Sequence, residues 1–158
     1  MKRTVSVAAL ALLAVVSLLA QSPKGWKLRV DRSMNASDPD AAGSIKFVTM
    51  GTGFHATNPQ AAVYWNPDNK ATGNYSLKGT FTLEKPSGPI EYYGLVFGGS
   101  DLEGANQNYL YFMVAQNGTW LVKRRDGDDT QNVSAKTPNA VVKKPDATGK
   151  STNALKCA

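Results

Sequence analysis

The chain has 158 residues, of which 42% are hydrophobic and 19% charged, and its formal net charge is +6. This length predicts one small domain. The longest cationic run is only Lys123 to Arg125, among twelve acids spread along the chain, so we do not expect the clustered basic face of a nucleic-acid-binding protein. Cys157 is the single cysteine, which excludes an intrachain disulfide and leaves no cysteine and histidine cluster for a structural zinc site.

Residues 1–20 have the pattern of a secretory signal peptide. Lys2 and Arg3 precede an apolar run that ends at Ala20, and a short positive segment followed by such a run is typical of export signals. The run is somewhat shorter than the roughly 20 apolar residues of a membrane span. We therefore expect a secreted or periplasmic protein with one mature domain, residues 21–158, and a charge of +4 once the two basic residues are removed. Membrane contact is expected only if the signal segment stays uncleaved.

The mature part alternates short apolar runs with turn sequences and shows no helical spacing. Strands are expected at residues 26–30, 44–50, 61–67, 73–86, 91–100, 108–116, 119–125, 130–135 and 153–158. Directly after the segment 44–50, Gly51 and Gly53 allow a tight reversal of the chain. The clearest alternation is in residues 73–86, where one face is predicted to be buried and carries Tyr75, Leu77, Gly79, Phe81 and Leu83. Many short strands separated by turns predict an all-β sandwich or barrel.

The segment YLYFMVAQNGTWLVKRR, residues 109–125, predicts a β-hairpin. Asn117-Gly118 suits a two-residue type I′ turn, which places Ala115 opposite Trp120 and Tyr111 opposite Arg124. One face of the hairpin would then carry Tyr109, Tyr111, Met113, Trp120, Val122 and Arg124. Both faces are substantially apolar, so we expect this hairpin at the centre of its sheet, with one face in the core and the other lining a ligand groove.

Three segments resemble a known family of exported β-sandwich proteins. They are GSIKFVTMGTGFHATNPQAAVYW, GNYSLKGTFTL and YYGLVFGGSDLEGANQNYLYFMVAQNGTWLVKRRDG. Together they resemble the 3-keto-disaccharide hydrolase domains, which are related to laminin-G and family 16 glycosidase sandwiches, over the range from about Trp26 to Leu155. The resemblance implies a concanavalin A-like jelly roll of two antiparallel sheets, with a concave face that in relatives often receives carbohydrate.

The sequence departs from this family in two ways. The catalytic pattern of family 16, E-x-D-x-x-E on one strand, is absent. The segment that resembles STNAL continues in relatives into further strands, whereas here the sequence ends at Ala158. We therefore expect a sandwich that lacks its last strands and leaves a sheet edge unpaired, and exposed edges favour association with other chains.

Candidate catalytic and metal-binding residues are few. Glycoside hydrolysis usually needs two carboxylates about 5 to 10 Å apart. The candidate acids and base are Glu91, Asp101, Glu103 and the single histidine, His55. After the hairpin, the DGDD turn offers the carboxylates of Asp126, Asp128 and Asp129, and oxygen-rich loops of this kind can bind calcium. Solvated loop acids and a structural histidine are the simpler interpretation of both groups.

Aromatic residues offer the better candidates for ligand binding, because flat rings with a polar edge can stack on sugars. The candidate carbohydrate-binding residues are Trp65, Tyr93, Tyr109, Tyr111, Trp120 and Arg124. For any one aromatic residue, burial in the sandwich core is the competing interpretation. The sequence thus favours a module that binds carbohydrate or polysaccharide. A glycoside hydrolase acting on a keto-disaccharide and a structural envelope domain without a small ligand remain the alternatives.

Overall fold

The computed structural model describes residues 22–31, 40–86 and 88–158, so the predicted signal peptide lies outside the described residues. Within these ranges the chain forms ten β-strands, and every paired strand runs antiparallel to its neighbour. The predicted all-β sandwich is confirmed. The described ranges contain no helix that is long and apolar enough to cross a membrane.

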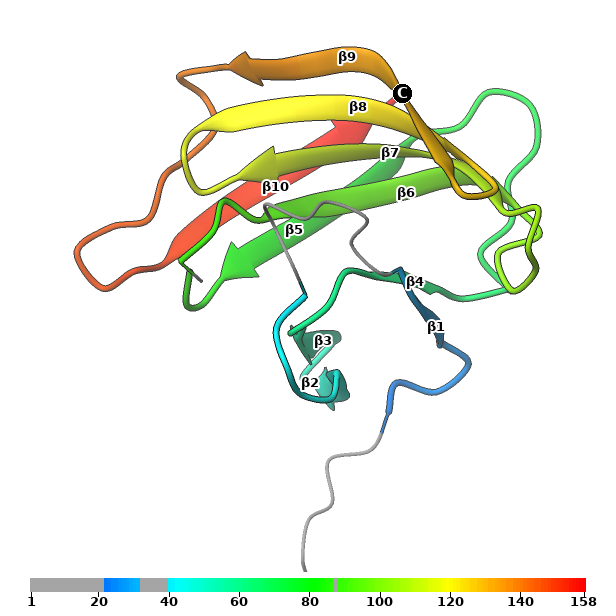
Figure 1. Ribbon diagram of the computed structural model, residues 1–158, viewed down its shortest axis with the longest axis horizontal. Helices are drawn as coiled ribbons and strands as arrows, with labels where there is room; N and C mark the ends of the chain where they lie inside the picture. Colours follow the sequence, from blue (N-terminus) through cyan, green and yellow to red (C-terminus); the bar gives the residue numbers. More distant parts are fainter. Residues whose placement is uncertain (1–21, 32–39, 87) are drawn as a thin grey trace, which may run out of the picture.

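Four consecutive strands form the largest sheet (Figure 1). They are β6 (Tyr92–Ser100), β7 (Asn108–Ala115), β8 (Thr119–Asp126) and β9 (Asp129–Pro138), and they follow one another in space as they do in sequence. The order is a meander, because short turns join antiparallel neighbours. The predicted hairpin supplies β7 and β8, the two inner strands, so its predicted central position is confirmed.

A second layer of two strands packs against this sheet. β5 (Leu77–Leu83) pairs with β10 (Ser151–Cys157), and the two run diagonally across the four-stranded sheet in Figure 1. The core between the layers contains the buried residues Leu95, Val114, Val142 and Leu155, with Leu77, Phe81, Tyr93, Phe112, Trp120 and Cys157 packed against them. The predicted alternation is confirmed within β5, where the apolar residues turn inward and Lys78, Thr80 and Thr82 are exposed. It is wrong for Tyr75, which precedes the strand and is 45% exposed.

Two small ribbons precede the sandwich in sequence. β1 (Lys27–Val30) pairs with β4 (Ala62–Trp65), and β2 (Lys46–Met50) pairs with β3 (Gly53–Thr57). Aromatic rings join the ribbons to each other: Tyr64 of β4 lies 4.3 Å from Phe47 of β2 and 6.4 Å from Phe54 of β3 between ring centroids. Such tilted pairs add roughly 0.5–1.5 kcal/mol each beyond the area they bury.

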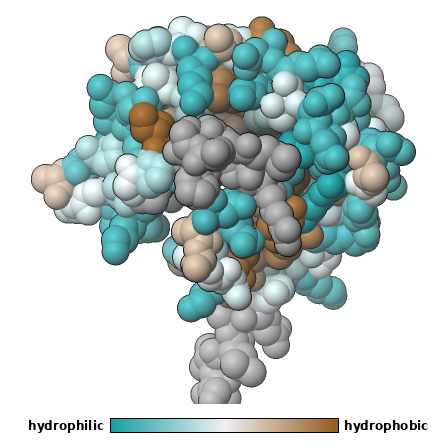
Figure 2. Space-filling view, viewed as in Figure 1, coloured by the Kyte–Doolittle hydropathy of each residue, from teal (hydrophilic) through white to brown (hydrophobic). Residues whose placement is uncertain are grey.

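Large apolar side chains are also found on the surface. Those with the greatest exposure are Leu28, Val30, Met50, Phe54, Tyr75, Ile90, Val133 and Val141. Figure 2 shows one face of the molecule, on which hydrophilic residues predominate and apolar residues gather in small patches. Scattered apolar residues of this kind are normal for a folded protein and need no partner to explain them.

The predicted register of the central hairpin is wrong by one residue. Val114, not Ala115, lies opposite Trp120, and Tyr111 lies opposite Lys123 rather than Arg124. The loop therefore has three residues, with Gly118 at a φ of +84°. A type I′ turn needs positive φ at both central positions, yet among the described non-glycine residues only Asp101 has positive φ. The side chain of Asn117 instead accepts a hydrogen bond from the backbone N–H of Thr119 (3.2 Å).

This shift moves every β8 side chain to the face opposite the predicted one, since side chains alternate along a strand. Trp120 therefore shares a face with Val114 and packs into the sandwich core. Tyr109 shares the other face with Arg125. That outer face is also buried in places: Tyr109 is 3% exposed and Leu121 2%.

Candidate functional site

An open depression of about 470 Å³ lies between the β1–β4 ribbon and the loop that follows β6. Its lining combines an aromatic ring, a guanidinium and a carboxylate with small residues: Leu28, Arg29, Trp65, Glu103, Gly104 and Ala105. These residues come from three separate segments of the chain. An aromatic surface with a few convergent polar groups is the usual composition of a small-molecule site.

The ribbon positions Trp65 and the basic residues on one side. Lys27 is the cross-strand partner of Trp65, and Arg29 is the partner of Val63. Because cross-strand partners and residues two apart share a face, all four side chains project from the same side of the ribbon. Val63 is 7% exposed and anchors that side. Trp65 is half-buried, so part of its ring remains open to a ligand.

The loop after β6 is shaped by Asp101. Its φ of +50° is unusual for a residue with a side chain, and its carbonyl accepts a hydrogen bond from Gly104 N (2.9 Å). Its carboxylate accepts another from Asn106 N (3.1 Å). A side chain at Gly104 would collide with that carboxylate. Asp101 therefore holds the loop together through its own backbone and side chain.

Two basic residues of β1 attach this loop to the ribbon. Arg29 Nη1 donates hydrogen bonds to the carbonyl oxygens of Leu102 (3.4 Å) and Gly104. Lys27 Nζ donates to Glu103 Oε1, and both side chains of this ion pair are about half exposed or more. The depression is thus bordered by one solvated ion pair and one guanidinium that is fixed by backbone carbonyls.

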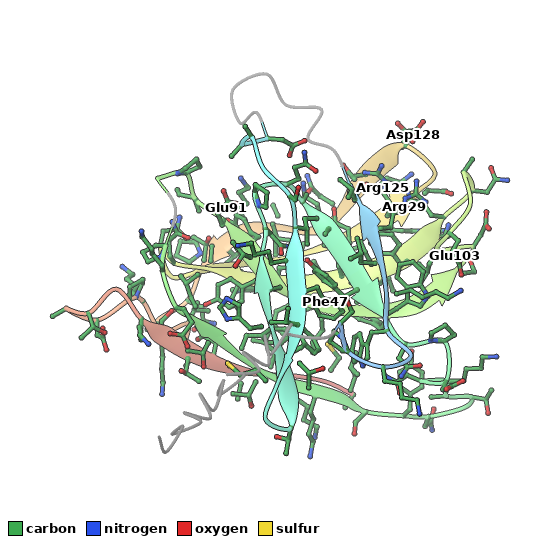
Figure 3. The ribbon with its side chains drawn as sticks, turned by 90° about the horizontal axis from the view of Figure 1, so that it is seen from below. Arg29, Phe47, Glu91, Glu103, Arg125 and Asp128 are labelled. Atoms are coloured by element: carbon green, nitrogen blue, oxygen red, sulfur yellow. The ribbon has the colours of Figure 1, made fainter. Side chains whose placement is uncertain are left out.

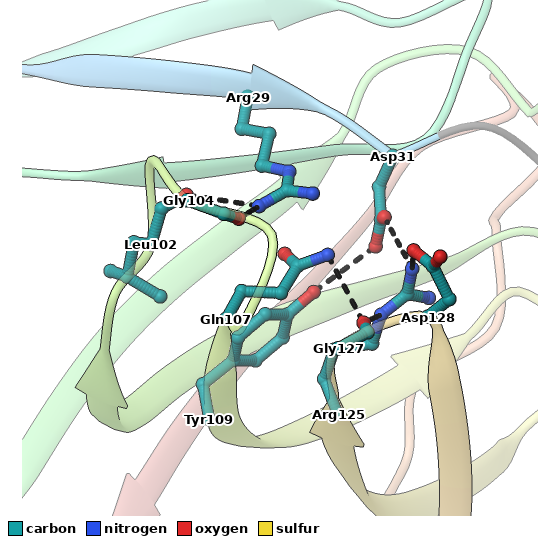
Figure 4. Close-up of polar contacts among 9 residues, drawn as sticks. All are labelled: Arg29, Asp31, Leu102, Gly104, Gln107, Tyr109, Arg125, Gly127 and Asp128. Carbon is teal, nitrogen blue, oxygen red and sulfur yellow. Dashed lines mark hydrogen bonds and ion pairs between the residues drawn. The ribbon is translucent and has the colours of Figure 1, made fainter.

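A buried polar cluster lies beside the depression (Figure 4). Tyr109 donates its hydroxyl proton to Asp31 Oδ2 (3.0 Å), and Asp31 also forms an ion pair with Arg125 (3.2 Å). The carbonyl of Gly127 accepts hydrogen bonds from Arg125 Nε (2.6 Å) and Gln107 Nε2 (3.2 Å). Gln107 is fully buried, and its Oε1 has no partner among the described residues. This cluster fixes the end of β1 against β7 and β8.

The cluster raises the pKa of Tyr109 far above its ordinary value. Burial is the main cause, and the negative charge of Asp31 adds to it. A group whose folded pKa is raised gives its full contribution to stability below its unfolded pKa, about 10 for tyrosine, and loses it as the pH rises further. The pKa of Tyr111 is raised as well, again mainly by burial.

Tyr109→Phe is expected to make alkaline unfolding less steep. At about pH 8 the variant should be roughly 1 kcal/mol less stable, because the hydrogen bond to Asp31 is lost. Above about pH 10 the wild type should lose stability faster than the variant. The reason is that Tyr109 ionises in the unfolded chain and so stabilises the unfolded state, whereas phenylalanine cannot ionise. Urea unfolding at several pH values between about 8 and 11 measures both effects. Parallel pH curves for the two proteins would contradict this expectation.

The predicted carbohydrate-binding residues do not gather at one place. Trp65 lines the depression. Tyr93 and Trp120 pack against the sandwich core, and Tyr93 also accepts a hydrogen bond from Asn153 (3.1 Å). Tyr109 is buried in the polar cluster.

Tyr111 and Arg124 are separated by the corrected register. Tyr111 stays on the face of Tyr109, with their ring centroids 5.7 Å apart. Arg124 projects from the opposite face, where Asn108 Oδ1 accepts from its Nε (3.4 Å).

The candidate catalytic acids are also dispersed. Glu91 precedes β6 and Glu103 follows it, and Figure 3 shows them at opposite sides of the molecule. A nine-residue strand spans roughly 30 Å, which is far beyond the separation that glycoside hydrolysis requires. His55 lies on β3 with its Nε2 3.4 Å from Thr57 Oγ1. The structure brings no second candidate carboxylate beside Glu103 except Asp101, which is bonded within its loop.

Of the three aspartates after the hairpin, Asp126 and Asp128 engage basic and amide side chains, and Asp129 is the exposed first residue of β9. Asp126 accepts from Asn108 Nδ2 (3.1 Å) and lies 3.9 Å from Arg124. Asp128 is 99% exposed and lies 3.9 Å from Arg125. Across the described ranges, no three His, Cys, Asp or Glu residues are grouped so that they could hold a metal ion. Calcium binding at this turn stays a prediction.

Several residues of the depression were not predicted from the sequence. Arg29, Gly104 and Ala105 line it, and Lys27 closes its edge. The alternation in KLRV does place Lys27 and Arg29 on one face, but it gives no indication that a loop more than 70 residues away meets that face. Comparison with protein-family models, with curated proteins and with solved structures finds no match.

Proposed function

We propose that the chain is an exported carbohydrate-binding β-sandwich protein, with its ligand in the depression beside Trp65. The observation that carries this proposal is the half-buried Trp65 ring beside Glu103 and Arg29. A sugar ring presents apolar C–H groups on its face and hydroxyls around its edge. An indole supports such a face, while a carboxylate accepts and a guanidinium donates hydrogen bonds to hydroxyls at the edge.

Binding is favoured over hydrolysis by the arrangement of acids. Glu103 is the only carboxylate among the described residues that line the depression. Hydrolysis of a glycosidic bond usually uses a pair of carboxylates, and the neighbouring Asp101 is engaged by Asn106 N and oriented by its own loop. The resemblance to carbohydrate-active sandwiches and the apolar N-terminal segment support the ligand class and the export of the protein.

Trp65→Ala is expected to weaken binding to the sugars that the wild type retains on a glycan array by at least about tenfold, because a central aromatic anchor commonly contributes more than 1.4 kcal/mol. Trp65→Phe keeps an aromatic face and should retain most of the affinity. Calorimetric titration measures the affinities, and far-UV circular dichroism verifies that each variant is folded.

Tyr75→Ala is the matched control, because Tyr75 is a 45% exposed aromatic residue that does not line the depression. Its affinity should equal that of the wild type. Unchanged binding in folded Trp65→Ala would contradict the proposed site. A wild type that binds no glycan on the array would contradict the function itself and favour a structural role.

A further inference from the structure

A second depression, of about 520 Å³, lies at the other end of the four-stranded sheet. Its lining comes from the β7–β8 loop and the segment after β9: Asn117, Gly118, Pro138, Asn139, Ala140, Val142, Lys143 and Lys144. The two segments are joined by a hydrogen bond from Asn139 N to the carbonyl oxygen of Gly118 (3.0 Å). The first depression adjoins the start of β7 and this one its end, so eight residues, or about 25 Å of strand, separate the two.

Both lysines of this depression are held in place by their surroundings. The backbone of Lys143 donates to Asn153 Oδ1 (2.9 Å) and accepts from Asn153 Nδ2 (3.2 Å). Asn153 is only 5% exposed, so this double hydrogen bond is buried. The side chain of Lys144 passes over Gly118, where an added Cβ would lie 2.7 Å from Lys144 Cε. The backbone of Lys143 and the stem of Lys144 are thus fixed, and both lysines line the same depression.

The polar side chains of the lining present donors rather than acceptors. Asn117 Oδ1 accepts from Thr119 N and from Thr119 Oγ1 (2.7 Å). Asn139 Oδ1 accepts from Val141 N (3.0 Å). Each amide oxygen already accepts a hydrogen bond within its own loop, whereas neither side-chain NH₂ group donates to another described residue, so these groups remain available as donors. Two ammonium groups and two amide NH₂ groups suit a ligand that only accepts hydrogen bonds.

The charge of this region is not balanced by acids. Residues 130–145 contain three lysines and no aspartate or glutamate, and of the flanking acids Asp129 and Asp146, Asp146 is engaged by Thr148 and by the backbone of Lys150. In the part of the chain that the structure describes, Lys136, Lys143 and Lys144 form no ion pair, whereas Lys27 and Lys150 each have a glutamate partner. Lys136 lies 5.1 Å above the ring of Tyr92. Uncompensated charge around a depression attracts a ligand of opposite sign.

We propose that this second depression binds the anionic group of an acidic sugar, a uronate carboxylate or a sulfate ester, through Lys143 and Lys144. The anionic character of the ligand follows from the donors and the charge of the lining. Its assignment to a sugar rests on the proposed function. An acidic polysaccharide would bind in this depression without having to occupy the depression beside Trp65.

Three trisaccharide probes test the proposal by calorimetric titration: trigalacturonic acid, a sulfated maltotriose and neutral maltotriose. The wild type is expected to bind at least one of the two anionic probes at this site, and whichever binds more tightly identifies the anionic group. Added NaCl should weaken that binding, because exposed charges are screened by salt. The Lys143→Gln, Lys144→Gln double variant should bind about five- to tenfold more weakly, which corresponds to two exposed ion pairs lost.

The Lys78→Gln, Lys156→Gln double variant is the matched control. These two exposed lysines are cross-strand partners on β5 and β10, so the control removes the same charge from another surface. Its affinity should change less than twofold. Trp65→Ala should bind the anionic probe as the wild type does. This variant disables only the first depression, so it separates a failure of the proposed function from a failure of the anion site.

Any one of four results would overturn the proposal. Equal weakening in both double variants would show that net charge alone attracts the probe. Binding of maltotriose to Trp65→Ala, in which the first depression is disabled, as tight as that of the anionic probes would exclude an anion site. The lysines would not form a sugar site if neither anionic probe bound. The same would follow if a short oligonucleotide or anionic lipid vesicles bound more tightly than both probes.

Discussion

Gly94→Ala is expected to unfold the protein or to destabilise it by at least about 3 kcal/mol. Gly94 lies on β6 opposite Met113 of β7. An added Cβ would overlap the carbonyl oxygen of Phe112 and would lie 2.8 Å from Met113 Cα. Both obstacles belong to the backbone of an inner strand, which cannot move aside as a flexible side chain can. Overpacking in a well-packed region typically costs 1–3 kcal/mol and occasionally more, and a clash with backbone belongs at the upper end.

Urea unfolding followed by circular dichroism measures this loss. Gly53→Ala is the control, because Gly53 also lies on a strand, yet its nearest obstacle is 3.9 Å from the added Cβ. We expect the control to lie within about 0.5 kcal/mol of the wild type, as surface substitutions usually do. If Gly94→Ala unfolded at the same urea concentration as the control, the close approach of β6 to β7 would be disproved.

The second large effect is expected at Asp31. Asp31→Ala should cost about 3 kcal/mol, because it leaves Arg125 without its close carboxylate partner and the hydroxyl of Tyr109 without its acceptor. The side chains of Arg125 and Asp31 are only 12% and 19% exposed. Removing one partner of a buried ion pair costs roughly 3–5 kcal/mol, since the remaining charge stays desolvated. Partial exposure places the estimate at the lower end of that range.

An exposed ion pair provides the comparison for Asp31. Lys150 and Glu84 form such a pair, with side chains 53% and 40% exposed. Exposed pairs contribute about 0–1 kcal/mol, so Glu84→Gln should lower the free energy of unfolding by less than about 1 kcal/mol. Equal urea midpoints for Asp31→Ala and Glu84→Gln would mean that solvent reaches the Asp31 cluster in full.

Sequence patterns predicted the strands better than they predicted the register. The alternation in β5 and the long apolar runs of β6, β7 and β8 identified those strands to within a few residues. Such runs carry a strong local signal, because alternating or continuous burial leaves its mark directly on the sequence. β3 was not predicted, since GFHAT is short, contains glycine and is mostly exposed.

The hairpin register depended on a local competition that the Asn-Gly motif does not reveal. Asn117 can serve a two-residue turn with its backbone in a left-handed conformation, or it can bond Thr119 through its side chain in a longer loop. The structure shows the second arrangement. Because the side-chain period of a strand is two, this choice reassigned Trp120 to the core and Arg124 to the opposite face from Tyr111.

Sequence patterns identified Trp65 and Glu103 as separate candidate residues of the site. They did not predict that the two residues lie close together. The depression requires β1, β4 and the loop after β6 to meet. Contacts between segments so distant in sequence depend on tertiary packing, which no short-range pattern encodes. Lys143 and Lys144 were overlooked for the same reason, because their common surface with Asn117 exists only once the segment after β9 folds back on the hairpin loop.

The separation of the β1–β4 ribbon from the main sandwich has a consequence for local stability. The ribbon is hydrogen-bonded as a sheet of its own and is attached to the rest partly by the side chains of Lys27, Arg29 and Asp31. Small units of this kind open independently of the core, with lower free energies than global unfolding. The depression beside Trp65 would disappear in such an opening while the sandwich stayed intact. A ligand bound there would therefore slow amide hydrogen exchange in the ribbon, because it stabilises the closed form alone.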